Sequence, residues 1–384
     1  MKSENMKKKF VAYFDRMEDV HLTKDVGLVP FYISKEFNLE LEYVTADACK
    51  ANEFRGVKIK KIKRLGSSSI NLNFYLFLLK NKGKIDYLMT FHCRNYSLLL
   101  GLIYKALNPA GKFYIKMDLG NPFEFQGRLE PKNFKNLKTI VIFKFLKLSR
   151  LVDLFSAEIN EVFEQLYANG IYQLDIKNKL TRIINGADDQ YIELSGYKNK
   201  KIIIQKKENI FLTVGRIGDY VKNNELLLDS IKNIDLKNWK LIIVGPIKES
   251  FRKKIEEFEN EYLHDKNKIE FLGGVYDREK IYEIYSKAKV FILTSRSEGF
   301  ANVFSEARYF GNYIITTDVG GAKEILKDSK HGERIENSMD LSEKIAEIVE
   351  GTKNIDTEYI LNNREEIAWS NIIRSNQKLR EIFG

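Results

Sequence analysis

Short apolar runs alternate with longer helix-like segments along most of this 384-residue chain. In the first half, five runs have the length and composition of strands: 10–14, 57–62, 86–91, 113–117 and 181–184. Helical periodicity is found at 25–36, 70–81, 95–107, 132–150 and 157–168. Repeated strand–helix–strand order predicts a parallel sheet with helices on both faces.

The alternation is interrupted once and then begins again. Residues 187–208 are polar, rich in lysine and weakly periodic, which indicates a junction between domains. Five more strand-like runs follow, at 210–214, 240–244, 269–272, 290–294 and 313–317. Helical patterns accompany them at 223–233, 249–262, 277–287, 302–310 and 340–350. The sequence therefore predicts an α/β protein of two doubly wound, Rossmann-like domains, residues 1–190 and 191–362.

Doubly wound sheets bind ligands at the carboxyl ends of their strands, and two facing domains would form a cleft between them. The last segment, at about 363–384, is an amphipathic helix pattern that includes Trp369. We expect its apolar side to pack against the nearest core.

Composition and charge narrow the class of protein. Hydrophobic residues make up 44% of the chain and charged residues 30%, which is typical of a soluble protein. The chain has no run of about 20 apolar residues, and its first apolar stretch is too short for a signal peptide. Two cysteines, Cys49 and Cys93, cannot form a disulfide framework, and four histidines make a structural zinc site unexpected. A reducing cytoplasm is predicted.

The net charge of +10 favours an anionic partner: nucleic acid, a membrane surface or a phosphorylated small molecule. The basic residues are spread along the chain, and no nucleic-acid recognition motif is present. Nucleic acid is therefore not expected as a partner.

A glycine loop follows the apolar run 210–214 and leads into a helical pattern. Such a loop presents unpaired N–H groups and a partial positive charge to a ligand. Gly215, Arg216 and Lys222 lie in it, and the two cations could hold a diphosphate. By themselves they could equally be solvated surface residues.

The stretch SRSEGFANVFSEARYFG places two carboxylates around the start of another helix. Gly299 follows Glu298 and indicates a tight turn, and Asn302 is a suitable N-cap residue. Glu306 lies one turn further on, where its two oxygens match the paired hydroxyls of a ribose. The alternative is an ordinary exposed glutamate. A third glycine loop, DVGGAKEIL at 318–326, also follows a strand-like run, so three loops are expected at one sheet edge.

These motifs resemble the retaining glycosyltransferases of family four, which have the GT-B fold. The resemblance rests on G-R-x…K-N, on S-x-x-E-G-F-x-N…E-A with its Glu-x7-Glu spacing, and on T-D-V-G-G-x-x-E-I. It is close over about 209–330 and weaker elsewhere, where VDLFSAE at 152–158 and NGAD at 185–188 are similar to family segments. The resemblance implies that the tail at 363–384 crosses back to the first domain.

The resemblance also implies roles for individual residues. Arg216 and Lys222 would bind the donor diphosphate, Glu306 the ribose, and Glu298 the donor sugar. The base would lie near Val275. Further donor contacts would come from the backbone at four positions: Gly299, Phe300, Ala301 and Asn302. The chain has no Asp-x-Asp, which fits an enzyme that needs no metal or other cofactor.

The first half resembles the family less closely. Family members usually carry a glycine-rich turn after the first strand; here Gly27, with Asp25 beside it, is the expected acceptor-side loop. Many members have a histidine near the donor sugar at a strand end. His92 is the expected counterpart, although a structural histidine is the alternative, and Asp118 is expected to accept a hydrogen bond from an acceptor hydroxyl. The expected catalytic set is thus Glu298, Arg216, Lys222, His92 and Asp118.

Residues 131–151 contain basic residues and no acidic ones among many large apolar residues. A basic amphipathic helix can bind an anionic membrane surface and so reach a lipid-linked acceptor. The alternative is a core helix with solvated lysines.

The resemblance implies transfer of a hexose-type sugar from a nucleotide diphosphate donor with retention of the anomeric configuration. UDP is the first choice of nucleotide. The expected acceptor is a lipid-linked or surface glycan in bacterial polysaccharide biosynthesis, on the cytoplasmic side of the membrane. Two alternatives stay open: a non-catalytic sugar- or partner-binding subunit of the same fold, and a nucleotide-sugar epimerase. The first is disfavoured by the donor motifs, and the second lacks an evident acid/base pair.

Overall fold

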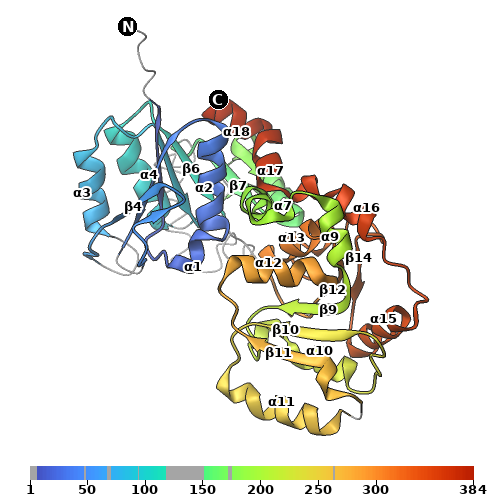
Figure 1. The fold of residues 1–384 in the computed structure, drawn as a ribbon. Helices are drawn as coiled ribbons and strands as arrows, with labels where there is room; N and C mark the ends of the chain where they lie inside the picture. The colour runs from blue at the N-terminus through green and yellow to red at the C-terminus, as the bar shows by residue number, and fades with distance from the viewer. Residues whose placement is uncertain are drawn as a thin grey trace. The chain divides into compact units, whose positions relative to one another are not determined.

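A computed structural model describes residues 7–46, 49–66, 71–93, 95–117, 151–171, 175–262 and 264–384. The chain forms two compact units, Met1–Ile184 with Trp369–Gly384, and Asn185–Ala368 (Figure 1). The chain therefore passes from unit 1 to unit 2 after Ile184, earlier than the predicted boundary at residue 190. The reason is that Asn185 and Ala187 already bond within the second unit: Asn185 Nδ2 donates to the carbonyl of Phe300, and Ala187 N to that of Ile367.

The described residues of unit 1 form an eight-stranded sheet in the order β3-β4-β2-β1-β5-β6-β7-β8, parallel except for the β3–β4 pair. The strands are β1 (Lys9–Tyr13), β2 (Glu40–Thr45), β3 (Glu53–Phe54), β4 (Val57–Lys61), β5 (Tyr87–Phe91), β6 (Lys112–Lys116), β7 (Leu154–Ala157) and β8 (Leu180–Arg182). The helices described here are α1 (Asp19–Leu22), α2 (Asp25–Glu36), α3 (Leu72–Lys80), α4 (Asn95–Leu107) and α7 (Asn160–Asn169). Strands β2, β3 and β7 were not among the runs predicted from the sequence.

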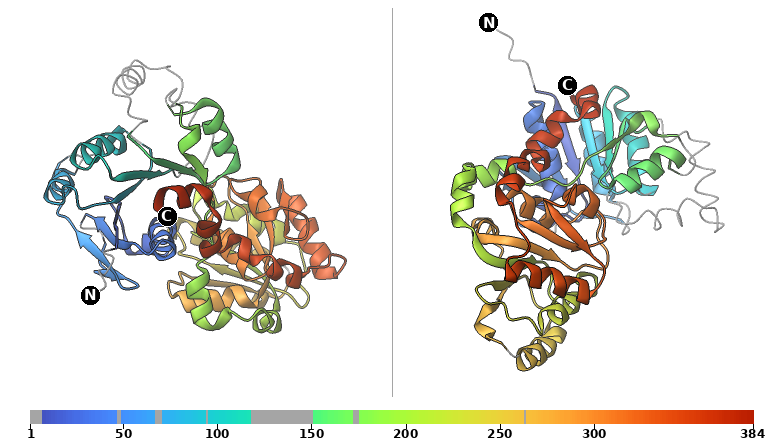
Figure 2. Two further views of the ribbon diagram at one scale, coloured as in Figure 1. Left: turned by 90° about the horizontal axis from the view of Figure 1, so that it is seen from above. Right: turned by 90° about the vertical axis from the view of Figure 1, so that its right-hand side faces the viewer.

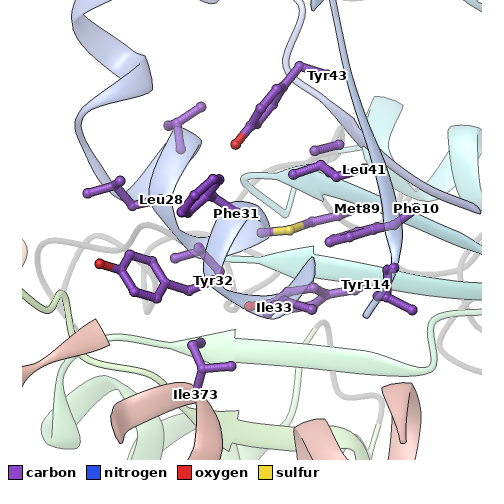
Figure 3. Close-up of a cluster of buried hydrophobic side chains, with 14 of the residues drawn as sticks. Phe10, Leu28, Phe31, Tyr32, Ile33, Leu41, Tyr43, Met89, Tyr114 and Ile373 are labelled. Atoms are coloured by element: carbon purple, nitrogen blue, oxygen red, sulfur yellow. The ribbon is translucent and has the colours of Figure 1, made fainter. Parts of the chain in front are cut away.

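The C-terminal helices α17 (Trp369–Ser375) and α18 (Gln377–Phe383) belong to unit 1. They lie beside α2 and the sheet, as the red and blue ribbons of Figure 2 show. Their apolar residues enter the cluster of buried side chains drawn in Figure 3, to which Ile373 contributes. The Phe383 ring lies 4.7 Å from that of Tyr87 and 5.5 Å from that of Phe10. The tail is therefore part of the core of unit 1.

Unit 2 has a six-stranded, fully parallel sheet in the order β11-β10-β9-β12-β13-β14. The strands are β9 (Glu208–Val214), β10 (Lys240–Val244), β11 (Ile269–Gly273), β12 (Ala288–Leu293), β13 (Tyr313–Thr317) and β14 (Gly332–Ile335). The helices are α8 (Asp189–Ile192), α9 (Lys200–Lys206), α10 (Asn224–Ile231), α11 (Glu249–Glu261), α12 (Arg278–Lys287), α13 (Asn302–Tyr309), α14 (Ala322–Leu326), α15 (Ser338–Glu350) and α16 (Thr357–Asn362).

Both sheets have the strand order of a Rossmann fold, so the predicted fold class is confirmed. In each, the chain leaves the central strand on one side and returns on the other. The switch point lies between β1 and β5 in unit 1 and between β9 and β12 in unit 2. Among the described residues, no helix is long and apolar enough to cross a membrane.

Replacing Phe383 by Ala tests the contribution of the tail. We expect unit 1 to lose about 3 kcal/mol or more of unfolding free energy, because a fully packed aromatic side chain leaves a cavity. Denaturant unfolding followed by Trp369 fluorescence, in a Trp239→Phe background, reports on unit 1 alone, since the chain has two tryptophans. Leu79→Ala, at a side chain that is 53% exposed, is the matched control. An unchanged midpoint for Phe383→Ala would contradict the packing.

Candidate functional site

The loops after β9 and β10 meet closely at the carboxyl edge of the sheet of unit 2. Gly215 N donates to the carbonyl of Val244 over 2.9 Å. Gly245 has a φ of +149°, and a Cβ there would lie 1.6 Å from the carbonyl oxygen of Gly215. Glycine is thus required at 245, where two main chains touch. The contact fixes the start of the loop that carries the predicted cations.

Lys222 and Glu298, 76 positions apart in sequence, form an ion pair at this edge. Lys222 Nζ donates to Glu298 Oε1 over 2.5 Å, and Ser295 Oγ donates to the same oxygen over 2.6 Å. Both charged side chains are mostly shielded from solvent, with exposures of 16% and 14%. The main chains are also joined, because Arg296 N donates to the carbonyl of Val221. A cation and a carboxylate are therefore held together beside the strand ends.

Arg216 lies at the same loop but points elsewhere. Its side chain is 60% exposed, and Nε donates to Asp219 Oδ2 over 2.9 Å. That hydrogen bond, followed by one from the N–H of Val221, lowers the pKa of the Asp219 carboxyl. Asp219 also caps the short 3₁₀ turn Tyr220–Lys222, which positions Lys222. The structure brings Lys222, but not Arg216, into contact with the glutamate turn.

The turn at Gly299 leads into α13. Phe300 is buried, and a Cβ on Gly321, whose φ is +82°, would lie 2.7 Å from its ring. The glycine pair before α14 thus gives Phe300 its space. Asn302 was predicted to be the N-cap of α13, but it is the first helical residue. Ala301 is the N-cap, and it offers no side-chain acceptor. The chain enters the helix one residue earlier because Phe300 and Ala301 are already packed.

Glu306 lies on α13 and pairs with a residue that the sequence did not indicate. Arg278 Nη2 donates to Glu306 Oε1. Arg278 is the first residue of α12, and Val275 lies half-buried in the loop just before it. Glu298 and Glu306 therefore have separate cationic partners. The sequence signal that could have indicated Arg278 is its place directly after the N-cap Asp277, in the loop that follows β11.

In unit 1, Asp25 lies in a buried cluster of charges with Lys116 and Glu158. Lys116, fully buried at the end of β6, donates to Asp25 Oδ2 over 2.8 Å and to Glu158 Oε1. Burial opposes the ionised form of Asp25, but the charge and the hydrogen bond of Lys116, together with the N–H of Val26, lower the pKa of that carboxyl. Glu158 follows β7 directly, a strand that the sequence analysis missed.

Gly27 was predicted to lie in a loop, but it lies in a helix. Helix α2 begins at Asp25, and Gly27 is buried within its first turn. A Cβ on Gly27 would lie 2.1 Å from the carbonyl oxygen of Leu22, so glycine is needed for the close approach of α1. Its own carbonyl accepts from the Tyr43 hydroxyl over 2.6 Å. Its role here is in packing.

His92 follows β5 with a φ of +61°, in the left-handed region. Its N–H donates to the carbonyl of Lys116 over 2.8 Å. His92 lines a pocket of about 360 Å³ at the switch point of unit 1, together with Phe14, Phe74 and Tyr96 among others. Asp118, and residues 131–150 of the basic segment, lie outside the described residues.

Asp15 holds the polar side of that pocket. Its Oδ1 accepts from the Tyr13 hydroxyl over 2.9 Å and from Asn71 Nδ2 over 3.1 Å, and its Oδ2 lies 3.1 Å from Arg64 Nη1. Burial, followed by the charge of Asp15, raises the pKa of the Tyr13 hydroxyl. The pocket thus combines aromatic faces with an anchored carboxylate. Among the described residues, no cluster of three or more His, Cys, Asp or Glu side chains could hold a metal ion.

Comparisons with known proteins show likeness to glycosyltransferases in sequence and in fold. Residues 197–366 match the sequence model of the family described as glycosyl transferases group 1. An uncharacterized glycosyltransferase of Methanocaldococcus jannaschii is 28% identical over 349 residues, covering 81% of this chain and 80% of that protein. An alpha-1,4-N-acetyl-D-galactosaminyltransferase of Campylobacter jejuni, named for a PP-undecaprenol-linked glycan, is 30% identical over 168 residues. That match covers 42% of this chain and 44% of the Campylobacter enzyme, less than half of its length.

The structure of HepE from Anabaena in complex with UDP is similar to this one with a TM-score of 0.68. The sequence identity is 14%, and the match covers 95% of this chain and 97% of HepE. At that identity the likeness shows the fold, which is GT-B. The fold and the relatives together support a glycosyltransferase.

Replacing Lys116 by Met tests the buried charge cluster. Two carboxylates would lose their cation, so we expect a loss of about 3–5 kcal/mol of unfolding free energy near neutral pH. Protonating them relieves the repulsion, so the deficit relative to wild type shrinks as the pH falls. Denaturant unfolding at several pH values measures both effects. Lys9→Met, at a more exposed pair with Glu42, should cost about 1 kcal/mol or less; an equal loss in both variants would contradict the assignment.

Proposed function

We propose that this protein transfers a hexose-type sugar from a nucleotide diphosphate sugar, UDP before other nucleotides, with retention and without a metal ion. The observation that carries the proposal is the Lys222–Glu298 pair at the switch point of unit 2. An ammonium group there can neutralise a departing phosphate, and a carboxylate beside it can accept from sugar hydroxyls. The group 1 match and the UDP complex of HepE support this choice of donor.

In the proposed mechanism, Lys222 leaves Glu298 partly and donates to the β-phosphate, with Arg216 recruited from its exposed position. The bond from the anomeric carbon to the phosphate oxygen breaks, and a bond to the acceptor oxygen forms on the same face. The acceptor proton passes to the departing phosphate oxygen, so no protein nucleophile is needed. Glu306 and the loop at Val275 bind the ribose and the base, while Phe300, Ala301 and Asn302 present backbone N–H groups.

We also propose that the aromatic pocket of unit 1 binds the acceptor. It lies at the switch point of a Rossmann-like sheet, where such folds bind ligands. Aromatic faces with an anchored carboxylate suit a sugar ring, and the left-handed backbone of His92 is the kind of strain found at functional sites. The Campylobacter relative supports a lipid-linked glycan as the acceptor class. As part of the same proposal, the protein lies on the cytoplasmic side of an anionic membrane and binds its surface through residues 131–151.

Lys222→Met tests the phosphate contact. We expect binding of UDP to weaken about 30-fold, because a hydrogen bond from a charged group contributes about 2 kcal/mol. Binding of uridine, which has no phosphate, should hardly change. Calorimetry with both ligands separates the two. Lys253→Met, on the exposed face of α11, is the control; a variant that binds UDP as tightly as wild type would contradict the role of Lys222.

Retention and metal independence are tested on turnover. NMR of the product should show the same anomeric configuration as the donor sugar, and excess EDTA should leave the rate unchanged. An inverted product would rule out the proposed mechanism. Loss of activity that Mg²⁺ or Mn²⁺ restores would rule out metal independence. A protein that binds a nucleotide sugar but transfers nothing to any lipid-linked or free glycan would favour the non-catalytic alternative.

A further inference from the structure

Arg278 and Glu306 form an ion pair between two neighbouring helices of unit 2. Arg278 begins α12, and its Nη2 donates to Glu306 Oε1 and, over 3.1 Å, to the Tyr282 hydroxyl oxygen. The guanidinium lies 4.7 Å from the centre of the Tyr282 ring. Two hydrogen bonds and the contact of its planar face with the Tyr282 ring therefore hold the arginine in place. The Glu306 carboxylate that it binds has little freedom to move.

The surroundings of the pair are aromatic. Glu306 is 12% exposed and Arg278 24%. Tyr285, on the same helix as Arg278, is fully buried, and burial, followed by the charge of Glu306, raises the pKa of its hydroxyl. A carboxylate in such a place needs a cation to stay ionised and in one rotamer. Arg278 supplies that cation from outside the helix that carries Glu306.

We propose that Arg278 is a positioning residue for nucleotide recognition. It holds Glu306 Oε1, so that the remaining oxygen faces the ribose hydroxyls and accepts from them. This inference rests on the proposed function, because it assigns Glu306 to the ribose, but it adds a residue that acts only through Glu306. The pair explains why a glutamate one turn into α13 can serve as a fixed acceptor.

The alternative is an ion pair that only stabilises the packing of α12 on α13. A structural pair would affect all ligands of the site equally when broken. A positioning pair would affect only those ligands whose ribose carries hydroxyls. The two roles are therefore separated by changing the ligand rather than the protein.

The experiment compares UDP with 2′,3′-dideoxyuridine diphosphate on the full-length protein by calorimetry. We expect Arg278→Met to weaken UDP binding about tenfold while changing binding of the dideoxy analogue by less than about twofold. In a Glu306→Ala background, Arg278→Met should add less than about twofold to the loss of UDP affinity. Arg278→Lys, which keeps a cation but not the planar group, should recover part of the loss.

Lys287→Met is the matched control, since Lys287 lies at the other end of α12 and pairs with Glu283 over 2.7 Å. It should bind both nucleotides like wild type. Thermal unfolding of each variant confirms that the fold is kept. Equal losses for UDP and the dideoxy analogue, or additive losses in the double variant, would overturn the positioning role while leaving the proposed function intact. A wild-type protein that binds no nucleoside diphosphate would overturn both.

Discussion

The position of β9 in the middle of its sheet determines where the chemistry of unit 2 is placed. Residues of β9 pair with β10 on one side and β12 on the other. The chain therefore returns to β9 only after two further strands, when β12 pairs with it, and the loops at 215–223 and 294–299 become neighbours although Lys222 and Glu298 are 76 positions apart. Parallel pairing sends both carboxyl ends to one edge. The Lys222–Glu298 ion pair and the contact of Gly245 with Gly215 follow from that arrangement.

Two cation–carboxylate pairs at this edge would contact different parts of a nucleotide sugar. Lys222 and Glu298 stand beside the strand ends, where the diphosphate and sugar would lie, and Arg278 and Glu306 lie between two helices, where the ribose would lie. In the free protein each glutamate is already compensated by its cation. Binding would exchange partners at the first pair, whereas the second would keep its hydrogen bond and use its remaining acceptor. One pair is thus suited to leaving-group chemistry and the other to recognition.

The local pattern of apolar residues was sufficient to predict most strands of the two sheets. Continuous apolar runs such as 240–244 coincide with strands, but β2 has charged residues at Glu40 and Glu42 in a short segment, which hid its strand character. Loop composition predicted that the loops carrying Lys222 and Glu298 lie at one edge of the sheet, because both follow strands. It could not predict Arg278 as the partner of Glu306, because that contact depends on how α12 packs against α13. Gly27 was misplaced for a related reason: its small size serves the contact with Leu22 rather than a turn.

Lys116 and Lys222 show why burial alone does not identify a ligand-binding cation. Lys116 is fully buried and holds two carboxylates, Asp25 and Glu158, so a third anion beside it would meet a cluster that is already negative. Lys222 keeps 16% of its side chain exposed and has one carboxylate, which a serine hydroxyl also stabilises. Glu298 could therefore release the ammonium to a phosphate and still keep a donor. The number of carboxylates and the residual exposure, rather than depth, assign Lys116 to the stability of unit 1 and favour Lys222 for the ligand.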